Sequence, residues 1–303
     1  GKDRSRMKPD DKPRPSKEAA RLTLMLDAVL GADRFDRGPV KVKELALEYS
    51  AKTSSQEPID RVVGDTLEGC MGALVPGEGT PRKWAIMHHL DQSPGRRNFT
   101  IGHELGHYLL HRSLIPPEGI YCDEESILRR NGEGIEKEAD LFAASLLMPF
   151  HDFRAQLPAK TRPDFEVLMR LAERYGVSLT AVILRWLEYT ETRAIMVVSN
   201  EGYAHWAKAS DAAYKSGLYI KTKDVVFELP SRSLAVRREF SDEAKTGIQQ
   251  ERGVWFYEPH GEMCIRSDRY DLEITLLHFG TVERWYGQSA RLEDTYERFI
   301  RRG

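Results

Sequence analysis

The segment His103-Glu104-Leu105-Gly106-His107 holds two histidines four positions apart, with a glutamate directly after the first. Residues four apart share one face of a helix, so the two imidazoles can bind one metal ion. The carboxylate of Glu104 can then reach a water on that ion without binding the metal itself. This arrangement is typical of metal-assisted hydrolysis, in which the metal lowers the pKa of the water and the carboxylate takes its proton. The segment therefore predicts His103 and His107 as metal ligands and Glu104 as the catalytic base.

A catalytic metal of this kind needs a third protein ligand, which the segment itself does not supply. His111 follows one turn after His107, but three ligands along two turns would spread over about 12 Å of helix, too far to converge. His111 is expected instead to interact with the carbonyl groups at the helix end. The longer zinc-binding motif HExxHxxGxxH, whose last histidine is the third ligand, is absent. The third ligand must therefore come from another element.

The next predicted helix opens with the acids Glu136, Glu138 and Asp140. Glu136 and Asp140 lie four apart on one face, so Glu136 can bind the metal while Asp140 orients a histidine. Glu138 points about 160° away from Glu136 on an ideal helix and stays open as the alternative ligand. All three acids would also complement the positive end of the helix dipole without any metal.

Two further features can serve a peptide substrate. Residues 84–89 predict a strand that leads toward the metal helix, and an exposed edge there could pair with an extended chain. An ordinary sheet strand fits the same pattern equally well. Tyr121, in the loop after the metal helix, is a candidate for stabilising an oxyanion, although a packed loop aromatic is the simpler interpretation.

The composition is that of a globular protein, with 41% hydrophobic and 30% charged residues in a chain of 303. A formal net charge of −2 gives no general reason to expect nucleic acid as a partner. No apolar run is long enough for a membrane span, and the N-terminus has no apolar signal stretch. The three cysteines Cys70, Cys122 and Cys264 form no CxxC pair, which favours reduced thiols and a cytoplasmic location.

The hydrophobic pattern predicts an α+β chain in several parts. A flexible arm is expected at 1–16, of which 1–6 resemble a cloning remnant, followed by domains at 17–157, 158–190 and 191–303. Helices are predicted at 17–30, 42–49, 99–110 (beginning near Thr100), 135–148, 164–175, 179–189, 232–240 and 288–301. Strands are predicted at 59–63, 70–75, 84–89, 194–199, 203–207, 218–221, 225–229, 254–257, 262–266 and 273–279, the later ones as an antiparallel sheet.

The stretches from Phe99 to His111 and from Ile135 to Pro149 resemble, in order, the two signatures of the ImmA/IrrE family. The resemblance implies a mainly helical, zincin-like peptidase domain with a small sheet, ligands His103, His107 and Glu136, and Glu104 as general base. It implies a zinc cofactor, and manganese is also compatible with the ligand set. The implied partner is a helix-turn-helix repressor of the DdrO type, cleaved to release radiation, desiccation and DNA-repair genes. The order of domains implies a helix-turn-helix and a GAF-like sensor after the peptidase domain.

The predicted helix pair at 164–189 has the spacing of a helix-turn-helix, with Gly176 at the turn. Its second helix offers only Arg185 as a cation, so packing against protein is favoured over reading DNA. The competing hypothesis is a non-proteolytic regulator that binds DNA or protein and uses the metal structurally. A broad-specificity peptidase is a third hypothesis.

Overall fold

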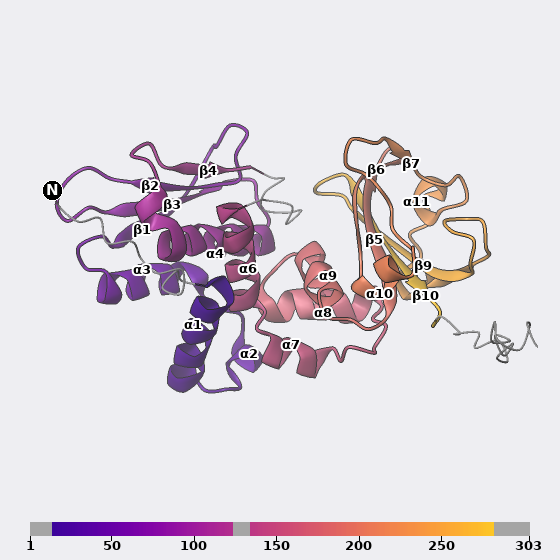
Figure 1. Ribbon diagram of the computed structural model, residues 1–303, viewed down its shortest axis with the longest axis horizontal. Coiled ribbons are helices and arrows are strands. Elements are labelled where there is room, and N and C mark those ends of the chain that lie inside the picture. The colour runs from indigo at the N-terminus through magenta and orange to yellow at the C-terminus, as the bar shows by residue number, and fades with distance from the viewer. Residues whose placement is uncertain (1–13, 124–133, 282–303) are drawn as a thin grey trace, which may run out of the picture.

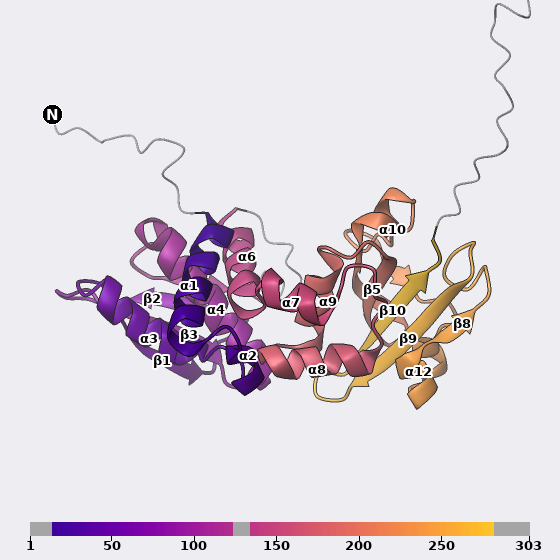
Figure 2. The same ribbon diagram turned by 90° about the horizontal axis from the view of Figure 1, so that it is seen from below.

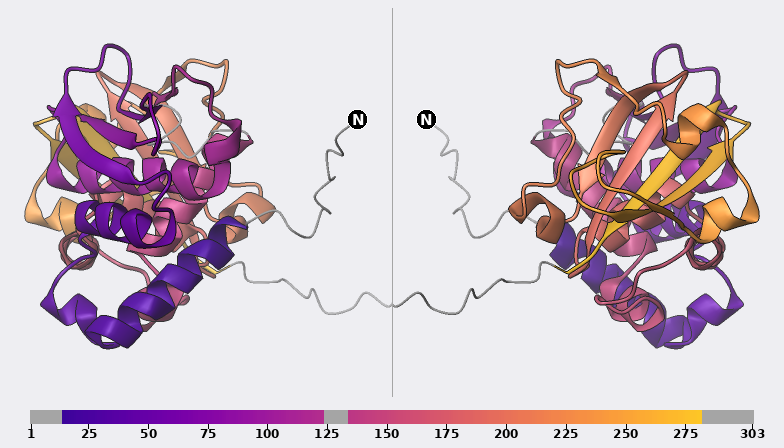
Figure 3. Two further views of the ribbon diagram at one scale, coloured as in Figure 1. Left: turned by 90° about the vertical axis from the view of Figure 1, so that its left-hand side faces the viewer. Right: turned by 90° about the vertical axis from the view of Figure 1, so that its right-hand side faces the viewer.

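The structure is a computed structural model that describes residues 14–123 and 134–281. The described chain is α+β, as predicted, with one sheet in each half of the chain and helices between them (Figure 1). The end views show the two sheets at opposite ends of the molecule (Figure 3). The predicted helix 288–301 and most of the predicted arm 1–16 lie outside the described residues.

The first half contains three helices before the sheet and two helices, α4 and α6, around the candidate site. The elements are α1 (Pro15–Leu30), α2 (Arg34–Arg37), α3 (Val42–Thr53), β1 (Ile59–Asp65), β2 (Gly72–Pro76), β3 (Trp84–His89), α4 (Pro94–His111), the 3₁₀ turn η2 (Arg112–Leu114), β4 (Ile120–Cys122) and α6 (Ile135–Leu147). Figure 1 shows the four strands above α3 and α4.

The first sheet has the strand order β1-β3-β2-β4. Strand β3 pairs in parallel with β1 and antiparallel with β2, so it lies inside the sheet. Of the two interpretations of residues 84–89, the exposed edge for a substrate is therefore wrong and the ordinary sheet strand is the one that forms. Among the described strands, β4 is the edge strand beside β2. It lies in the segment after the metal helix that the sequence predicted as a loop.

Helix α4 begins at Pro94, earlier than the start near Thr100 that the sequence suggested. Proline fits the first turn because its missing N–H would have no partner inside the helix. The hydroxyl of Ser93 accepts a hydrogen bond from the N–H of Arg96 and caps the helix. The added turn carries the helix start toward the second half of the chain.

Helices α4 and α6 pack closely through the small residues of α4. A methyl group on Gly106 would lie 3.0 Å from Phe142 Cδ1 and 3.2 Å from Ala139 Cα. A methyl group on Gly102 would meet Ala143 Cβ at 3.4 Å, an ordinary contact. The glycine at 106 thus permits the approach that brings the first turn of α6 to the metal-binding face of α4.

The middle of the chain is helical, with α7 (Phe150–Gln156), α8 (Phe165–Tyr175) and α9 (Leu179–Leu187). Gly176 ends α8 with a left-handed backbone (φ 59°), which glycine adopts without strain. The following helix α9 is almost wholly buried. Figure 2 shows α8 extending between the two halves of the molecule.

The second sheet is antiparallel throughout, with the order β7-β6-β5-β10-β9-β8. Its elements are β5 (Arg193–Asn200), β6 (Tyr203–Ala209), α10 (Asp211–Lys215), β7 (Phe227–Glu228), α11 (Leu234–Arg237), α12 (Asp242–Thr246), β8 (Ile248–Gln250), β9 (His260–Ser267) and β10 (Leu272–Phe279). The strands predicted at 218–221 and 254–257 do not form. Leu218, Trp255 and Phe256 instead pack against the sheet from its connections, which explains their apolar character.

The turn between β9 and β10 contacts the start of α4. The hydroxyl of Tyr270 accepts a hydrogen bond of 2.8 Å from the backbone N–H of Ser93, and the guanidinium of Arg96 lies 3.6 Å from the centre of the Tyr270 ring. Arg269 donates to the carbonyl of Asp91 at 2.8 Å. In the described ranges, no helix has the length and apolar character needed to cross a membrane.

Candidate metal centre

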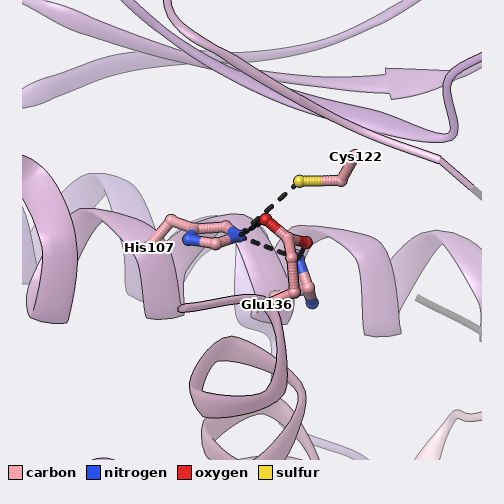
Figure 4. A group of neighbouring side chains, drawn as sticks. His107, Cys122 and Glu136 are labelled. Carbon is pink, nitrogen blue, oxygen red and sulfur yellow. Dashed lines mark hydrogen bonds and ion pairs between the residues drawn. The ribbon is translucent and has the colours of Figure 1, made fainter. Parts of the chain in front are cut away.

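The two histidines of α4 and the first acid of α6 meet in one small region. Nε2 of His103 and Nε2 of His107 are 3.0 Å apart. The Glu136 carboxylate contacts both, with Oε2 at 3.2 Å from His103 Nε2 and Oε1 at 3.3 Å from His107 Nε2. The sulfur of Cys122 joins this group, and the four donor atoms all lie within 4.8 Å of one another. Figure 4 shows His107, Cys122 and Glu136 turned toward one another.

The donor set fits a divalent transition metal. Imidazole, carboxylate and thiolate are the ligands that zinc prefers, and neighbouring ligand atoms around a tetrahedral zinc are about 3.3–3.6 Å apart. The separations of 3.2 and 3.3 Å from Glu136 and 3.6 Å between Cys122 Sγ and His107 Nε2 agree with this range. The two nitrogens of His103 and His107 are slightly closer, at 3.0 Å. The residues could therefore hold one metal ion with little rearrangement.

A carboxylate fixes the orientation of His103. Asp140 Oδ1, on α6, lies 2.9 Å from His103 Nδ1, so the ring donates its Nδ1 proton to the carboxylate. The Nε2 atom of His103 then faces His107 and Glu136. Burial alone would lower the pKa of His103, but the carboxylates of Asp140 and Glu136 outweigh it and raise the pKa to about 10. Without a metal, His103 therefore carries a proton that an ion would have to displace.

A second chain of contacts fixes the orientation of His107. Nδ1 of His107 lies 3.1 Å from Nδ1 of His111, and Nε2 of His111 lies 2.8 Å from Glu138 Oε2. The carboxylate only accepts, so His111 donates from Nε2 and accepts at Nδ1. His107 must then carry its proton on Nδ1, which leaves the Nε2 lone pair toward the donor group. Burial lowers the pKa of His107 to about 4, although the Glu136 carboxylate opposes this decrease. The ring of His107 is therefore neutral near pH 7.

The geometry separates the two glutamates that the sequence left open. Glu136 contacts His103 and His107, whereas Glu138 contacts His111 at the far end of the chain. Glu138 therefore lies in the position of a group that supports a histidine, and Glu136 in that of a ligand. His111 occupies the intermediate position, a role that the sequence interpretation as a helix-end residue missed. Its spacing of four from His107 was the available signal.

Glu104 is fully buried beside the donor group. No hydrogen bond of ordinary length and angle reaches its carboxylate oxygens among the described residues, and the thiol of Cys122 is a donor beside it. Burial raises the pKa of Glu104 to about 7, and the charge of His103 opposes this increase. The strand β2 lies directly against it, because a methyl group on Gly72 would come within 2.6 Å of Glu104 Oε1. A buried carboxylate next to a metal-binding group is suited to accepting a proton from water.

Strand β4 brings Cys122 to the site but not Tyr121. Cys122 is 1% exposed, whereas Tyr121 is 53% exposed, and adjacent residues of a strand point to opposite faces. Burial raises the pKa of the Cys122 thiol, and the charges of Glu104 and Glu136 raise it further, so a thiolate there requires a cation. The sequence gave no pair of cysteines to suggest a ligand, and only the pairing of β4 with β2 reveals the position.

Residues 74–187, from β2 to the end of α9, match the family model of the IrrE N-terminal-like domain, peptidase M78. The match covers the part of the chain that contains the site, and it is to the family that the two signatures resemble. The chain is also similar to the radiation response metalloprotease IrrE of Deinococcus radiodurans, with 24% identity over 203 residues. That alignment covers 65% of this chain and 60% of the relative, so it spans less than two thirds of the relative's length.

Proposed function

We propose that the protein is a metal-dependent endopeptidase of the gluzincin type, with zinc, or alternatively manganese, as its metal. The observation that carries the proposal is the convergence of His103, His107 and Glu136 beside the fully buried carboxylate of Glu104. The family match and the similarity to a metalloprotease support the same conclusion.

The residues divide the work of peptide hydrolysis among them. His103, His107 and Glu136 would hold the metal, while Asp140 and the pair His111–Glu138 keep the two rings oriented. When bound, a metal in such a site acts as a Lewis acid that polarises a carbonyl and makes water more acidic. Glu104 accepts the proton of the attacking water on a carboxylate oxygen and delivers it to the nitrogen of the leaving amine.

We further propose that the substrate is a helix-turn-helix repressor of the DdrO type, cleaved in the cytoplasm to start a radiation, desiccation and DNA-damage response. The support is the family resemblance and the radiation response that the name of the relative states. The cysteines that the structure describes are free, in keeping with a reducing compartment. The helix pair α8–α9 would be a helix-turn-helix element, and the second sheet a GAF-like sensor.

The catalytic assignment is tested with Glu104→Gln, which keeps the size of the side chain but cannot accept the proton. Purified wild-type and variant proteins are incubated with a DdrO-type repressor and zinc or manganese, and the products are identified by mass. The variant should retain its metal content, measured by elemental analysis, and lose cleavage by at least about 100-fold. Cleavage at the wild-type rate by the metal-loaded variant would refute the mechanism.

A second candidate function is a non-proteolytic regulator with a structural metal, and the sulfur of Cys122 favours it because a fourth protein ligand closes a site. Direct reading of DNA by α9 has less support. Arg185, its one cation, is 1% exposed, donates to Met148 O and Glu188, and stacks on Phe150 at 3.4 Å. Binding to a DNA operator that persists after metal removal and weakens steeply with salt would support this second function.

A further inference from the structure

We propose that Cys122 is a fourth protein ligand of the metal and that it keeps the resting protein latent. The inference rests on the metal site of the proposed function, but it concerns a residue outside the two signature helices. Three ligands leave one position open for the water that hydrolysis requires, whereas four protein ligands leave none. The assignment of Cys122 therefore decides whether the site is open or closed at rest.

The position of the sulfur is that of a ligand. Sγ of Cys122 lies 3.6 Å from His107 Nε2, and two ligand atoms on a tetrahedral zinc, one sulfur and one nitrogen, are about 3.5 Å apart. The same sulfur lies within 4.8 Å of the donor atoms of His103 and Glu136. It thus approaches the group from the sheet, while the histidines and the glutamate come from the two helices (Figure 4).

The surroundings of Cys122 differ from those of a cysteine that merely fills apolar space. Its neighbours at the site are the carboxylates of Glu104 and Glu136 and the ring of His107. Cys264 provides the contrast within the same chain, because it is equally buried but lies in a central strand where its sulfur accepts a hydrogen bond from the hydroxyl of Thr275. A buried thiol among metal-binding groups is better explained by coordination than by packing.

The strand that carries Cys122 can move without breaking the rest of the sheet. β4 is three residues long and, within the described parts of the chain, lies at the edge of the sheet and pairs only with β2, where Cys122 is opposite Gly72. Withdrawal of so short an edge strand would remove the sulfur while His103, His107 and Glu136 stay in place on their helices. The site would then have three protein ligands and an open position, with Glu104 already beside it.

The coordination is tested with cobalt in place of zinc, because cobalt bound by a thiolate shows a sulfur-to-metal charge-transfer band in the near ultraviolet. The wild-type protein should show this band, and so should Cys264→Ala, which removes a buried cysteine far from the site. Cys122→Ala and Cys122→Ser should each bind cobalt without the band. A wild-type cobalt protein without the band would overturn the proposal, whatever the variants do.

The affinity for zinc, measured by competition with a chelator, should fall at least about tenfold in both Cys122 variants, since even groups that only support a ligand contribute that much. Unchanged affinity would overturn the proposal. With saturating metal, the Cys122 variants should cleave the repressor faster than the wild type. A rate equal to or below that of the wild type would refute latency. If the band and the affinity behave as expected but neither the variants nor the wild type cleaves, the ligand assignment stands and the proposed protease function fails.

Discussion

Nδ1 of His111 lies 3.1 Å from Nδ1 of His107. His111, which lies outside the group of donor atoms, can therefore determine which ring nitrogen of His107 faces that group. Replacement by phenylalanine in His111→Phe removes the acceptor for the Nδ1 proton of His107 and frees the ring to rotate or change tautomer. We expect the affinity for zinc to fall about 10- to 100-fold, as measured by competition with a chelator.

Glu138→Gln is the matched control for this prediction. Its amide oxygen can still accept the Nε2 proton of His111, so the orientation of the rings should persist and the affinity should fall much less. Equal losses in both variants would show that the charge of Glu138, rather than the orientation of His107, supports the metal.

The sequence could predict the parts of this site that depend on helical spacing. His103, His107, Glu136 and Asp140 follow from residues four apart on two helices, and no long-range information is needed to place each pair on one face. Cys122 could not be predicted in this way, because its position depends on how β4 pairs with β2, far away in the sequence.

The same distinction explains the errors in the fold. The sequence predicts the strand at 84–89 with its correct bounds. Its position inside the sheet depends on pairing with both β1 and β2, and a local sequence pattern contains no information on that pairing. The segment 254–257 shows the converse case. Its aromatic residues suggested a strand by composition, whereas Trp255 and Phe256 pack beside a sheet formed by other residues and Tyr257 is exposed.

Metal binding should strengthen as the pH rises. The carboxylates of Asp140 and Glu136 raise the pKa of His103 to about 10 against the effect of burial, so below that pH the metal must displace a proton. Each proton displaced makes the apparent affinity rise by about tenfold per pH unit. Titrations at three pH values between 6.5 and 8.5 would measure this slope, and calorimetry in buffers of different ionisation enthalpy would count the protons released. A flat dependence would contradict the assigned proton on His103.

The packing of α4 on α6 gives a prediction with a control in the same helix. Gly106→Ala places a methyl group 3.2 Å from Ala139 Cα and should push apart the helices that carry the ligands, with at least a tenfold loss of zinc affinity. Gly102→Ala makes only an ordinary contact at 3.4 Å. It should preserve the affinity and stabilise the helix by up to about 1 kcal/mol in urea unfolding. Equal metal affinities of the two variants would show that the spacing of the helices does not determine the site.

A substitution in β2 should separate catalysis from metal binding. A methyl group on Gly72 would lie 2.6 Å from Glu104 Oε1 and 2.5 Å from Thr100 Cγ2, so Gly72→Ala must displace the carboxylate. A displacement of this size can reduce the rate of cleavage by about 100-fold. The zinc affinity should change little, because His103, His107 and Glu136 are held by α4 and α6, and Cys122 keeps its backbone pairing opposite residue 72. Gly261→Ala, in strand β9, is the control, since its nearest contact is an ordinary 3.5 Å and its activity should match the wild type. Normal cleavage by Gly72→Ala would show that the rate does not depend on the contact between residue 72 and the Glu104 carboxylate.

The junction between the helix pair and the second sheet should weaken in acid because of His278. This residue is 9% exposed, its Nε2 donates to the carbonyl of Pro163 at 3.1 Å, and its ring packs edge-on against Trp186 at 5.7 Å. Burial lowers the pKa of His278 from 6.5 to about 4, with Pro163 opposing and the nearby charge of Arg162 reinforcing the shift. Between pH 6.5 and about 4, His278 is therefore neutral in the folded protein and protonated in the unfolded chain.

The sign follows from the two pKa values. Above pH 6.5 neither state binds the proton, so the full stability is present; as the pH falls toward 4 the unfolded state gains the proton and stability is lost. At pH 5 the loss from this group should be about 2 kcal/mol relative to pH 7.5. His278→Gln keeps a donor for Pro163 but does not titrate, so its free energy of unfolding in urea should change less between these pH values by about that amount. The same change in both proteins would show that protonation of His278 does not control this junction.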